Sequence, residues 1–276
     1  MPSRPPLPAT AKRTIVFAHA NGFPAGVYAP LLSRWRAAGF RVEAPARLGH
    51  DPRFAVTSGW RRLRDELVEF IEALSPPPGP VLLVGHSLGG LLALMIACRR
   101  PELVRGLVML DSPIPSGWRA HSVHMAKRLG LMGRVGPGAI SAKRRQSWPT
   151  RASVRAHFAA KSVFARWDPR ALDAYVASGF EDRDGQVVLA FRREVETHIY
   201  NTLPHDLASL VRRHPPRCPV AFIAGTRSLE MRRAGSTVVR KLAGERLCQI
   251  EGSHLYPMER PDETARRVLD LLATFG

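Results

Sequence analysis

Residues 81–90 of the chain read Val-Leu-Leu-Val-Gly-His-Ser-Leu-Gly-Gly, and an apolar stretch, Leu-Leu-Ala-Leu-Met-Ile-Ala, follows directly. The run Val81–Val84 is typical of a strand buried on both faces, and the stretch after Ser87 is typical of a buried helix. The turn between them, Gly85-His86-Ser87-Leu88-Gly89, has the pattern G-x-S-x-G. In this context the pattern predicts a strained strand-to-helix turn that presents the Ser87 hydroxyl at the carboxyl end of a sheet.

The two glycines of this turn have a physical reason to be there. Gly85 and Gly89 have no Cβ, so neighbouring backbone can approach them closely. The helix that begins after Ser87 adds free N–H groups and a partial positive charge beside the hydroxyl. The alternative is a glycine-rich turn that only packs a helix against a strand.

Short apolar runs alternate with helical patterns on both sides of this turn. The expected strands are Thr14–Ala18, Phe40–Ala44, Val81–Val84, Gly106–Leu110, Pro219–Ala224 and Arg246–Ile250. The expected helices are Tyr28–Ala38, Ser58–Leu74, Leu88–Arg100, part of Leu229–Ala243, and Glu259–Phe275. This alternation, with fully apolar strands, predicts an α/β fold with a mostly parallel sheet of about six strands and helices on both faces.

The alternation stops between residues 112 and 217, where Trp, His, Pro and Arg are more frequent. Helical patterns remain around Trp118–Leu129, Thr150–Ala160 and Phe191–Thr197. We therefore expect residues 1–111 and 218–276 to form the core, and residues 112–217 to form a helical lid inserted between two strands of the sheet.

This order of elements, with the Ser87 turn at its centre, resembles the α/β-hydrolase superfamily over nearly the whole chain. The resemblance implies the α/β-hydrolase fold and a serine nucleophile at position 87. About thirteen residues precede the first expected strand. The two N-terminal strands of many relatives are therefore expected to be shortened or absent.

A serine nucleophile needs a general base and an acid that orients it, and the superfamily places them in the order serine, acid, histidine. His254 lies between the last expected strand and the last helix, where the resemblance puts the base. The position of the acid in this sequence differs from the common pattern of the superfamily. Relatives usually carry aspartate three residues after the glycine that ends the preceding strand, but here that position is Ser228.

Some relatives, certain dehalogenases and lipases among them, carry the acid one strand earlier. Asp111 ends that earlier strand, so it is the predicted acid of the triad. The alternatives are Glu230 as the acid, or a dyad with no acid. In those cases Asp111 is a turn residue before the insertion.

An acyl-transfer site also needs N–H donors for the developing oxyanion. The resemblance implies the backbone N–H of Leu88 as one donor. The second is expected from the loop after the first strand, His19-Ala20-Asn21-Gly22-Phe23-Pro24, which resembles the His-Gly-x-Pro loops of relatives. The alignment of this loop with those of relatives is ambiguous, so the second donor is the backbone N–H of either Asn21 or Phe23. His19, His86 and Tyr200 are the predicted substrate-binding residues.

The chain is strongly basic, with 41 Lys and Arg against 23 Asp and Glu and a formal net charge of +18. No acidic residue lies between Asp111 and Asp168, so this stretch is expected to attract anions. Nucleic acid is not an expected partner, because no nucleic-acid-binding motif accompanies the charge. Trp118–Leu131 mixes Trp, Leu and Met with Arg and Lys. Weak contact of the lid with anionic lipid or an acidic carrier is therefore one expectation, and a solvated lid is the other.

Composition excludes several classes of protein. The hydrophobic fraction of 45% excludes general disorder, and no apolar window is long enough for a transmembrane helix. Three scattered cysteines and the lack of a secretory signal favour a reduced, cytoplasmic protein without a metal site. No cofactor is expected.

Together these residues predict a serine hydrolase that cleaves a small-molecule carboxylic ester or thioester through Ser87, His254 and Asp111 and an acyl-enzyme. The alternatives are a C–C bond hydrolase or lyase with the same triad, or a non-catalytic ligand-binding homologue.

Overall fold

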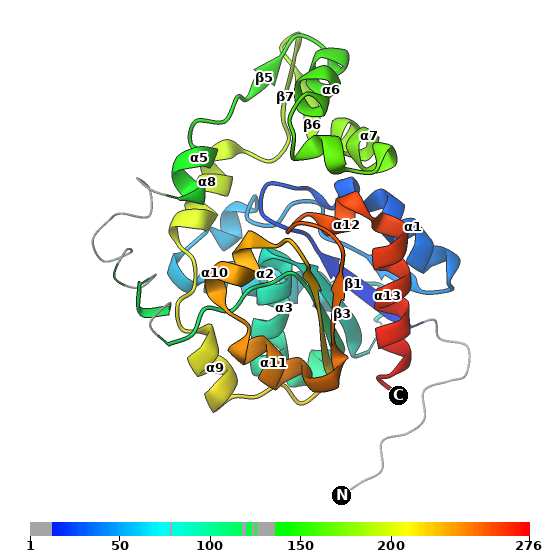
Figure 1. Ribbon diagram of the computed structural model, residues 1–276, viewed down its shortest axis with the longest axis vertical. Helices are drawn as coiled ribbons and strands as arrows, with labels where there is room; N and C mark the ends of the chain where they lie inside the picture. The colour runs from blue at the N-terminus through cyan, green and yellow to red at the C-terminus, as the bar shows by residue number, and fades with distance from the viewer. Residues whose placement is uncertain (1–12, 78, 118–119, 123–124, 126–135) are drawn as a thin grey trace, which may run out of the picture.

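The computed structural model describes residues 13–77, 79–117, 120–122, 125 and 136–276 (Figure 1). Its main sheet has six strands: β1 (Thr14–Ala18), β2 (Arg41–Glu43), β3 (Val81–His86), β4 (Val104–Leu110), β8 (Val220–Gly225) and β9 (Leu247–Ile250). They lie in the order β2-β1-β3-β4-β8-β9, and every neighbouring pair is parallel. The six-stranded parallel sheet expected from the sequence is confirmed.

The strand order places the site. From β1 the chain moves outward to β2 and then returns to β3 on the other side of β1. The loops that follow β1 and β3 therefore leave the sheet in opposite directions. In open α/β sheets this reversal creates the crevice where ligands bind, at the carboxyl ends of the strands. Ser87 follows β3, and the loop with Asn21 follows β1.

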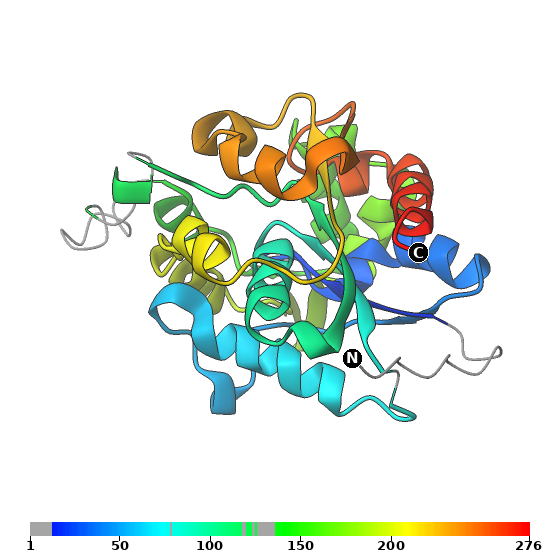
Figure 2. The same cartoon turned by 90° about the horizontal axis from the view of Figure 1, so that it is seen from below.

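Helices cover both faces of the sheet because strand side chains alternate between the faces. Ile15 and Phe17 of β1 pack on one side with α1 (Ala29–Ala37) and α13 (Pro261–Ala273). Val16 and Ala18 point to the other side, toward α2 (Arg61–Glu72) and α3 (Leu88–Arg99). Figure 2 shows α1 and α13 together on one side and α2 and α3 on the other. The remaining helices of this part are α9 (Leu207–Arg213), α10 (Leu229–Ala234), α11 (Thr237–Ala243) and α12 (Tyr256–Glu259).

One expected helix is interrupted. The pattern over Leu229–Ala243 forms α10 and α11, because Gly235 adopts a φ of 81° that ends the first of them. The expected helix Glu259–Phe275 forms as α13, which begins at Pro261, after the separate short helix α12 ends at Glu259. Proline has no N–H to continue a helix and is well suited to begin one.

The segment between β4 and β8 contains helices and also a small sheet. Besides α9, its described α-helices are α5 (Pro137–Ser141), α6 (Arg151–Ala159), α7 (Pro169–Ser178) and α8 (Arg193–Asn201). Its strands β5 (Ser147–Trp148), β6 (Phe180–Arg183) and β7 (Gln186–Leu189) form an antiparallel sheet in the order β5-β7-β6. The expectation of helices alone was incomplete. The sequence signal for the hairpin is Asp184-Gly185, whose positive φ angles of 50° and 72° suit a two-residue turn. Most of the expected helix Trp118–Leu129 lies outside the described residues.

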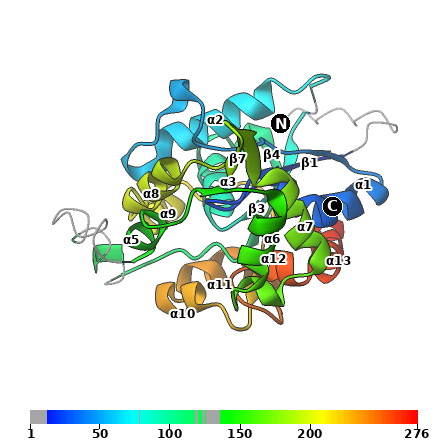
Figure 3. The same cartoon turned by 90° about the horizontal axis from the view of Figure 1, so that it is seen from above.

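The inserted segment packs on the loop that follows β1 (Figure 3). Trp167 and Tyr175 contact the ring of Phe23, with ring centroids 5.7 and 5.8 Å away. Gly26 lies so close to α7 that a Cβ there would be 2.5 Å from Cβ of Ser178. The insertion is therefore held against the same crevice that the strand order creates.

The helices of the described residues are short. The longest of them, α13, has 13 residues. Within this part of the chain, none has the length and apolar content needed to cross a lipid bilayer.

Candidate active site

The turn between β3 and α3 holds Ser87 in a strained conformation. Its φ of 52° and ψ of −113° are rare for a residue with a side chain. The turn is stabilised by the Ser87 N–H, which donates to the carbonyl oxygen of Leu110 at 2.9 Å. A Cβ at Gly85 would lie 2.4 Å from the carbonyl carbon of Gly89, and one at Gly89 would lie 2.0 Å from the carbonyl oxygen of Ala18. Only glycine fits at both positions.

Gly89→Ala is expected to destabilise the protein by at least about 3 kcal/mol, because the new methyl group meets rigid backbone of β1. The measurement is urea unfolding followed by circular dichroism. The matched control is Gly39→Ala, a glycine with a φ of 90° and open space around the Cβ position. This control is expected to cost about 1–2 kcal/mol. Equal losses in the two variants would contradict the crowding argument.

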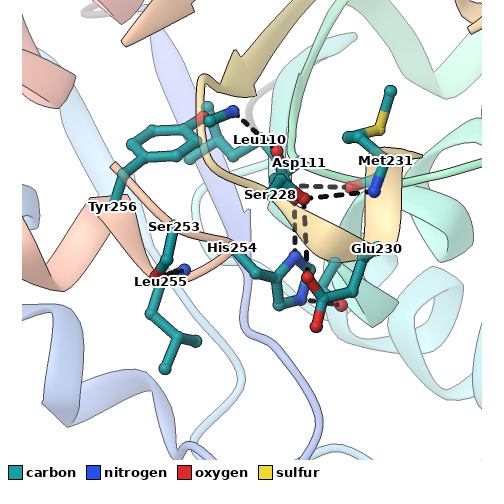
Figure 4. Close-up of polar contacts among 12 residues, drawn as sticks. Leu110, Asp111, Ser228, Glu230, Met231, Ser253, His254, Leu255 and Tyr256 are labelled. Carbon is teal, nitrogen blue, oxygen red and sulfur yellow. Dashed lines mark hydrogen bonds and ion pairs between the residues drawn. The ribbon is translucent and has the colours of Figure 1, made fainter. Parts of the chain in front are cut away.

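Three side chains from distant parts of the sequence meet at this turn. His254 Nε2 lies 3.0 Å from Ser87 Oγ, and His254 Nδ1 lies 2.7 Å from Asp111 Oδ2. Ser87 follows β3, Asp111 follows β4, and His254 lies in the loop after β9. The structure thus brings together the three residues that the sequence singled out as nucleophile, base and acid. Figure 4 shows His254 directed toward Asp111.

Asp111 is fully buried and is surrounded by hydrogen-bond donors. Its Oδ1 accepts the N–H of Gly225 at 2.7 Å, and its Oδ2 accepts the hydroxyl of Ser228 at 2.5 Å as well as His254. Three donors satisfy a buried carboxylate in its charged form. The backbone is also constrained, because Asp111 has a φ of 43° and its N–H donates to Ile223.

Ser228, which occupies the position of the usual acid, has a role that the sequence analysis missed. Its hydroxyl donates to Asp111, and the same oxygen accepts the N–H of Met231 at 3.1 Å, so it also caps α10. It is therefore a buried support for the displaced acid. A serine at a helix N-cap is recognisable from sequence, but its contact with Asp111, 117 positions away, is not.

Glu230 is the second acidic residue near the base. A carboxylate oxygen of Asp111, a carboxylate oxygen of Glu230 and a ring nitrogen of His254 all lie within 4.8 Å of one another. Nevertheless it is Asp111 that accepts from Nδ1 of His254. Glu230 is exposed on the first turn of α10, with Oε2 3.5 Å from the Ser228 hydroxyl.

Opposing effects act on His254. Burial lowers its pKa, but the hydrogen bond and charge of Asp111 and the charge of Glu230 raise it, and the net result is a pKa above the ordinary 6.5. Nδ1 keeps its proton and donates it in the hydrogen bond to Asp111, so Nε2 is available to take a proton from Ser87. This is the arrangement of a general base beside a hydroxyl nucleophile.

His86 supports the loop that carries His254. Its Nε2 donates to the backbone carbonyl of His254 at 2.8 Å, so its Nδ1 must accept from the hydroxyl of Tyr28 at 2.7 Å. Burial, more than the nearby His254, lowers the pKa of His86 well below 6.5. The ring is fully buried and both nitrogens are bonded. The structure therefore contradicts the prediction that His86 binds substrate.

The same correction applies to His19. Its Nε2 accepts the N–H of Leu48 at 2.8 Å, and its Nδ1 donates to the carbonyl of Ala20 at 2.9 Å. The side chain has no exposed surface, and burial lowers its pKa to about 4. His19 therefore ties the loop after β1 to the loop after β2 and does not reach a substrate.

The two expected second donors for an oxyanion differ in the structure. The N–H of Phe23 donates to the carbonyl of Ala20 at 3.2 Å and closes a turn. This contact contradicts the expectation that Phe23 donates to substrate and leaves Asn21 as the expected donor from this loop. Leu88 is the first residue of α3, so its N–H has no acceptor within the helix.

The inserted segment fixes this loop through α8. The side-chain amide of Asn21 donates to the backbone carbonyl of Glu196 at 3.0 Å. The Glu196 carboxylate is buried against Gly22 and accepts from Arg144 at 2.8 Å. Tyr200, also on α8, lies close enough to Asn21 and Glu230 for both to act on its pKa, which burial mainly raises. The contact of Tyr200 with substrate stays a prediction.

Curated proteins similar to this chain include a thioesterase and a lipase homolog. The type I acyl-CoA thioesterase mpaH of Penicillium roqueforti is 26% identical over 193 residues, which cover 64% of this chain and 42% of that protein. The monoglyceride lipase homolog of Monkeypox virus is 26% identical over 142 residues, which cover 49% of this chain and 51% of that protein. The chain thus spans only about half of these relatives or less.

Among solved structures, E-2-(acetamidomethylene)succinate hydrolase is similar with a TM-score of 0.73 at 19% identity, covering 95% of this chain and 92% of that one. At 19% identity, this similarity is evidence of a shared fold alone. The model of the alpha/beta hydrolase family matches residues 15–267, which include the Ser87 turn and the main sheet except for Thr14, the first residue of β1. The chain belongs to the alpha/beta hydrolase family.

Proposed function

We propose that this hydrolase is a serine esterase or thioesterase that acts on a small-molecule acyl substrate through an acyl-enzyme. The observation that carries the proposal is the continuous chain of contacts from Ser87 Oγ to His254 to Asp111, at 3.0 and 2.7 Å. Similarity to a thioesterase and to a lipase homolog supports the same chemistry.

In the first half of the reaction Ser87 Oγ attacks the carbonyl carbon, and its proton moves to Nε2 of His254. Asp111 keeps the Nδ1 proton in place and stabilises the imidazolium that forms. The N–H groups of Leu88 and Asn21 are the proposed donors to the oxyanion. When the tetrahedral intermediate collapses, the C–O or C–S bond breaks and His254 gives its proton to the leaving alkoxide or thiolate.

In the second half water replaces the leaving group. His254 takes a proton from the water, whose oxygen attacks the acyl carbon, and the proton then returns to Ser87 Oγ as the acid product leaves. In this proposal residues 112–217 form the lid over the acyl group. Phe23, which is partly exposed and packs on the buried rings of Trp167 and Tyr175, provides apolar surface in the loop that holds Asn21.

The cysteines support a further part of the proposal, a reducing cytoplasmic location. Cys98, Cys218 and Cys248 are all free, and burial raises the pKa of each thiol, to about 12 for Cys98 and about 11 for Cys218. Thiols with such values are rarely in the reactive thiolate form at neutral pH.

The pH dependence of kcat/KM is expected to follow the base. His254 must be neutral to accept the serine proton, and its pKa lies above 6.5. Activity is therefore full above that pKa and falls about tenfold per pH unit below it. The measurement is kcat/KM for one ester between pH 5 and pH 9, at constant ionic strength. A rate that stays flat down to pH 5 would contradict the assignment of His254.

Function is tested with a substrate panel of matched pairs. Each pair has the same acyl group, from acetyl to palmitoyl, on an oxygen and on a sulfur leaving group. We expect hydrolysis that depends on acyl length, because a lid pocket selects the acyl group, and that disappears in Ser87→Ala. Cleavage of a C–C diketone substrate with no ester or thioester turnover would overturn the proposal in favour of a C–C hydrolase.

A further inference from the structure

Glu230 is held beside the base by the same hydroxyl that supports the acid. Ser228 caps α10 and donates to Asp111, which places Glu230, two residues further on, next to His254. Its carboxylate lies 3.5 Å from the Ser228 hydroxyl and within the 4.8 Å cluster with Asp111 and His254 (Figure 4). The mechanism above gives this carboxylate no task.

We propose that Glu230 is a second acid for His254, a positioning residue that stabilises the imidazolium by its charge and without a hydrogen bond. The inference rests on the proposed function, since it concerns the base of that reaction. The two acids act on His254 in different ways. Buried Asp111 selects the tautomer and orients the ring, whereas exposed Glu230 adds negative charge where solvent and ions can reach it.

The other groups that face His254 leave Glu230 free to act. His86 lies with its ring centroid 5.1 Å away, but burial keeps it neutral. Tyr256, beside Asp111, donates its hydroxyl to the backbone carbonyl of Ile223, and burial holds its pKa well above 10.

The charged groups near the His254 loop pair with one another. The Glu259 carboxylate accepts from the Ser253 hydroxyl, and Arg227 pairs with Glu251 at 2.7 Å and more loosely with Glu259 at 3.8 Å. Across the described residues, Glu230 forms no ion pair with Lys or Arg.

The exposure of Glu230 limits how far its charge can shift the pKa of His254. A charge pair at the surface contributes well under 1 kcal/mol in most proteins, which corresponds to a pKa change of about half a unit. Such a pair is screened by salt, because the Debye length falls to about 3 Å at 1 M. The buried pair of His254 and Asp111 is screened much less. Salt therefore separates the contributions of the two acids.

The test is the pKa of His254, read from the proton NMR titration of its imidazole and assigned by comparison with His254→Gln. Glu230→Gln is expected to lower this pKa by about half a unit in 0.05 M NaCl and to leave it unchanged in 1 M NaCl. The control is Glu245→Gln, which removes the same charge from the exposed turn before β9. This control is expected to leave the pKa of His254 where it is.

A pKa that does not move in Glu230→Gln, or a shift that persists unchanged in 1 M NaCl, would overturn the inference. The titration needs no substrate, so it gives a result even if no ester or thioester is cleaved. If turnover is found, the acidic limb of kcat/KM must move to lower pH by the same amount in Glu230→Gln. Turnover without that movement would also count against Glu230.

Discussion

Replacing Ser87 by alanine is expected to lower kcat for the best ester substrate by roughly a million-fold. The hydroxyl is the only group that the proposed mechanism uses to form the covalent intermediate. The oxyanion donors remain, so a residual rate of about a thousandfold above uncatalysed hydrolysis is expected. The measurement is the single-turnover rate constant, determined with enzyme in excess over substrate so that a slow residual rate can be resolved.

The control for this variant is Ser33→Ala, on the exposed side of α1, where the hydroxyl donates only to its own helix at Pro30. Its activity should equal that of the unmodified enzyme. Ser87→Ala keeps a Cβ in the same strained turn, so its unfolding midpoint should change little. A loss of less than a hundredfold in folded Ser87→Ala would remove Ser87 from the role of nucleophile.

Asp111→Asn is expected to lower kcat by about 10,000-fold, the size measured when the acid of another serine triad is replaced by its amide. The Gly225 N–H needs an acceptor and binds Oδ1 at 2.7 Å, so the amide oxygen is expected to stay there. The amide NH2 then faces His254 and cannot accept a hydrogen bond from its Nδ1–H. The imidazole is left in the wrong tautomer, with its proton on Nε2 toward Ser87.

Two further variants separate Asp111 from its alternatives. Glu230→Gln alone should lower kcat by less than tenfold, because this carboxylate makes no hydrogen bond to the imidazole. Asp111→Asn combined with Ser228→Asp should recover part of the lost activity. The Ser228 hydroxyl already lies 2.5 Å from the oxygen that binds His254. Equal losses in Asp111→Asn and Glu230→Gln would contradict the choice of Asp111.

The fold was predictable because its signals are local. Apolar runs such as Thr14–Ala18 and Val81–Val84 identify buried parallel strands without any knowledge of their neighbours. The Ser87 turn was equally visible, because its glycines, strand and helix are contiguous. Chain order then pointed to His254 and Asp111, and the structure places both beside Ser87. Their catalytic roles are predictions that the variants above test.

The remainder of the site depends on partners that no local pattern reveals. His86 looked available for substrate, but its nitrogens are taken by Tyr28 and by the backbone of His254, 168 positions away. His19 is bound by the N–H of Leu48, in a loop that approaches only in the folded state. Phe23 was excluded as a donor by a turn within its own loop. Each error came from hydrogen bonds formed by tertiary structure or by loop geometry.

Covalent labelling tests directly whether Ser87 is an activated nucleophile, and it needs no known substrate. The folded protein is treated with a fluorophosphonate probe, and the adduct is read by intact mass for the unmodified chain and for Ser87→Ala. We expect one adduct per chain, at Ser87, that is absent from Ser87→Ala and is formed far more slowly by Asp111→Asn. A folded, unmodified chain that takes up no probe, or that is labelled equally after Ser87→Ala, would contradict this expectation.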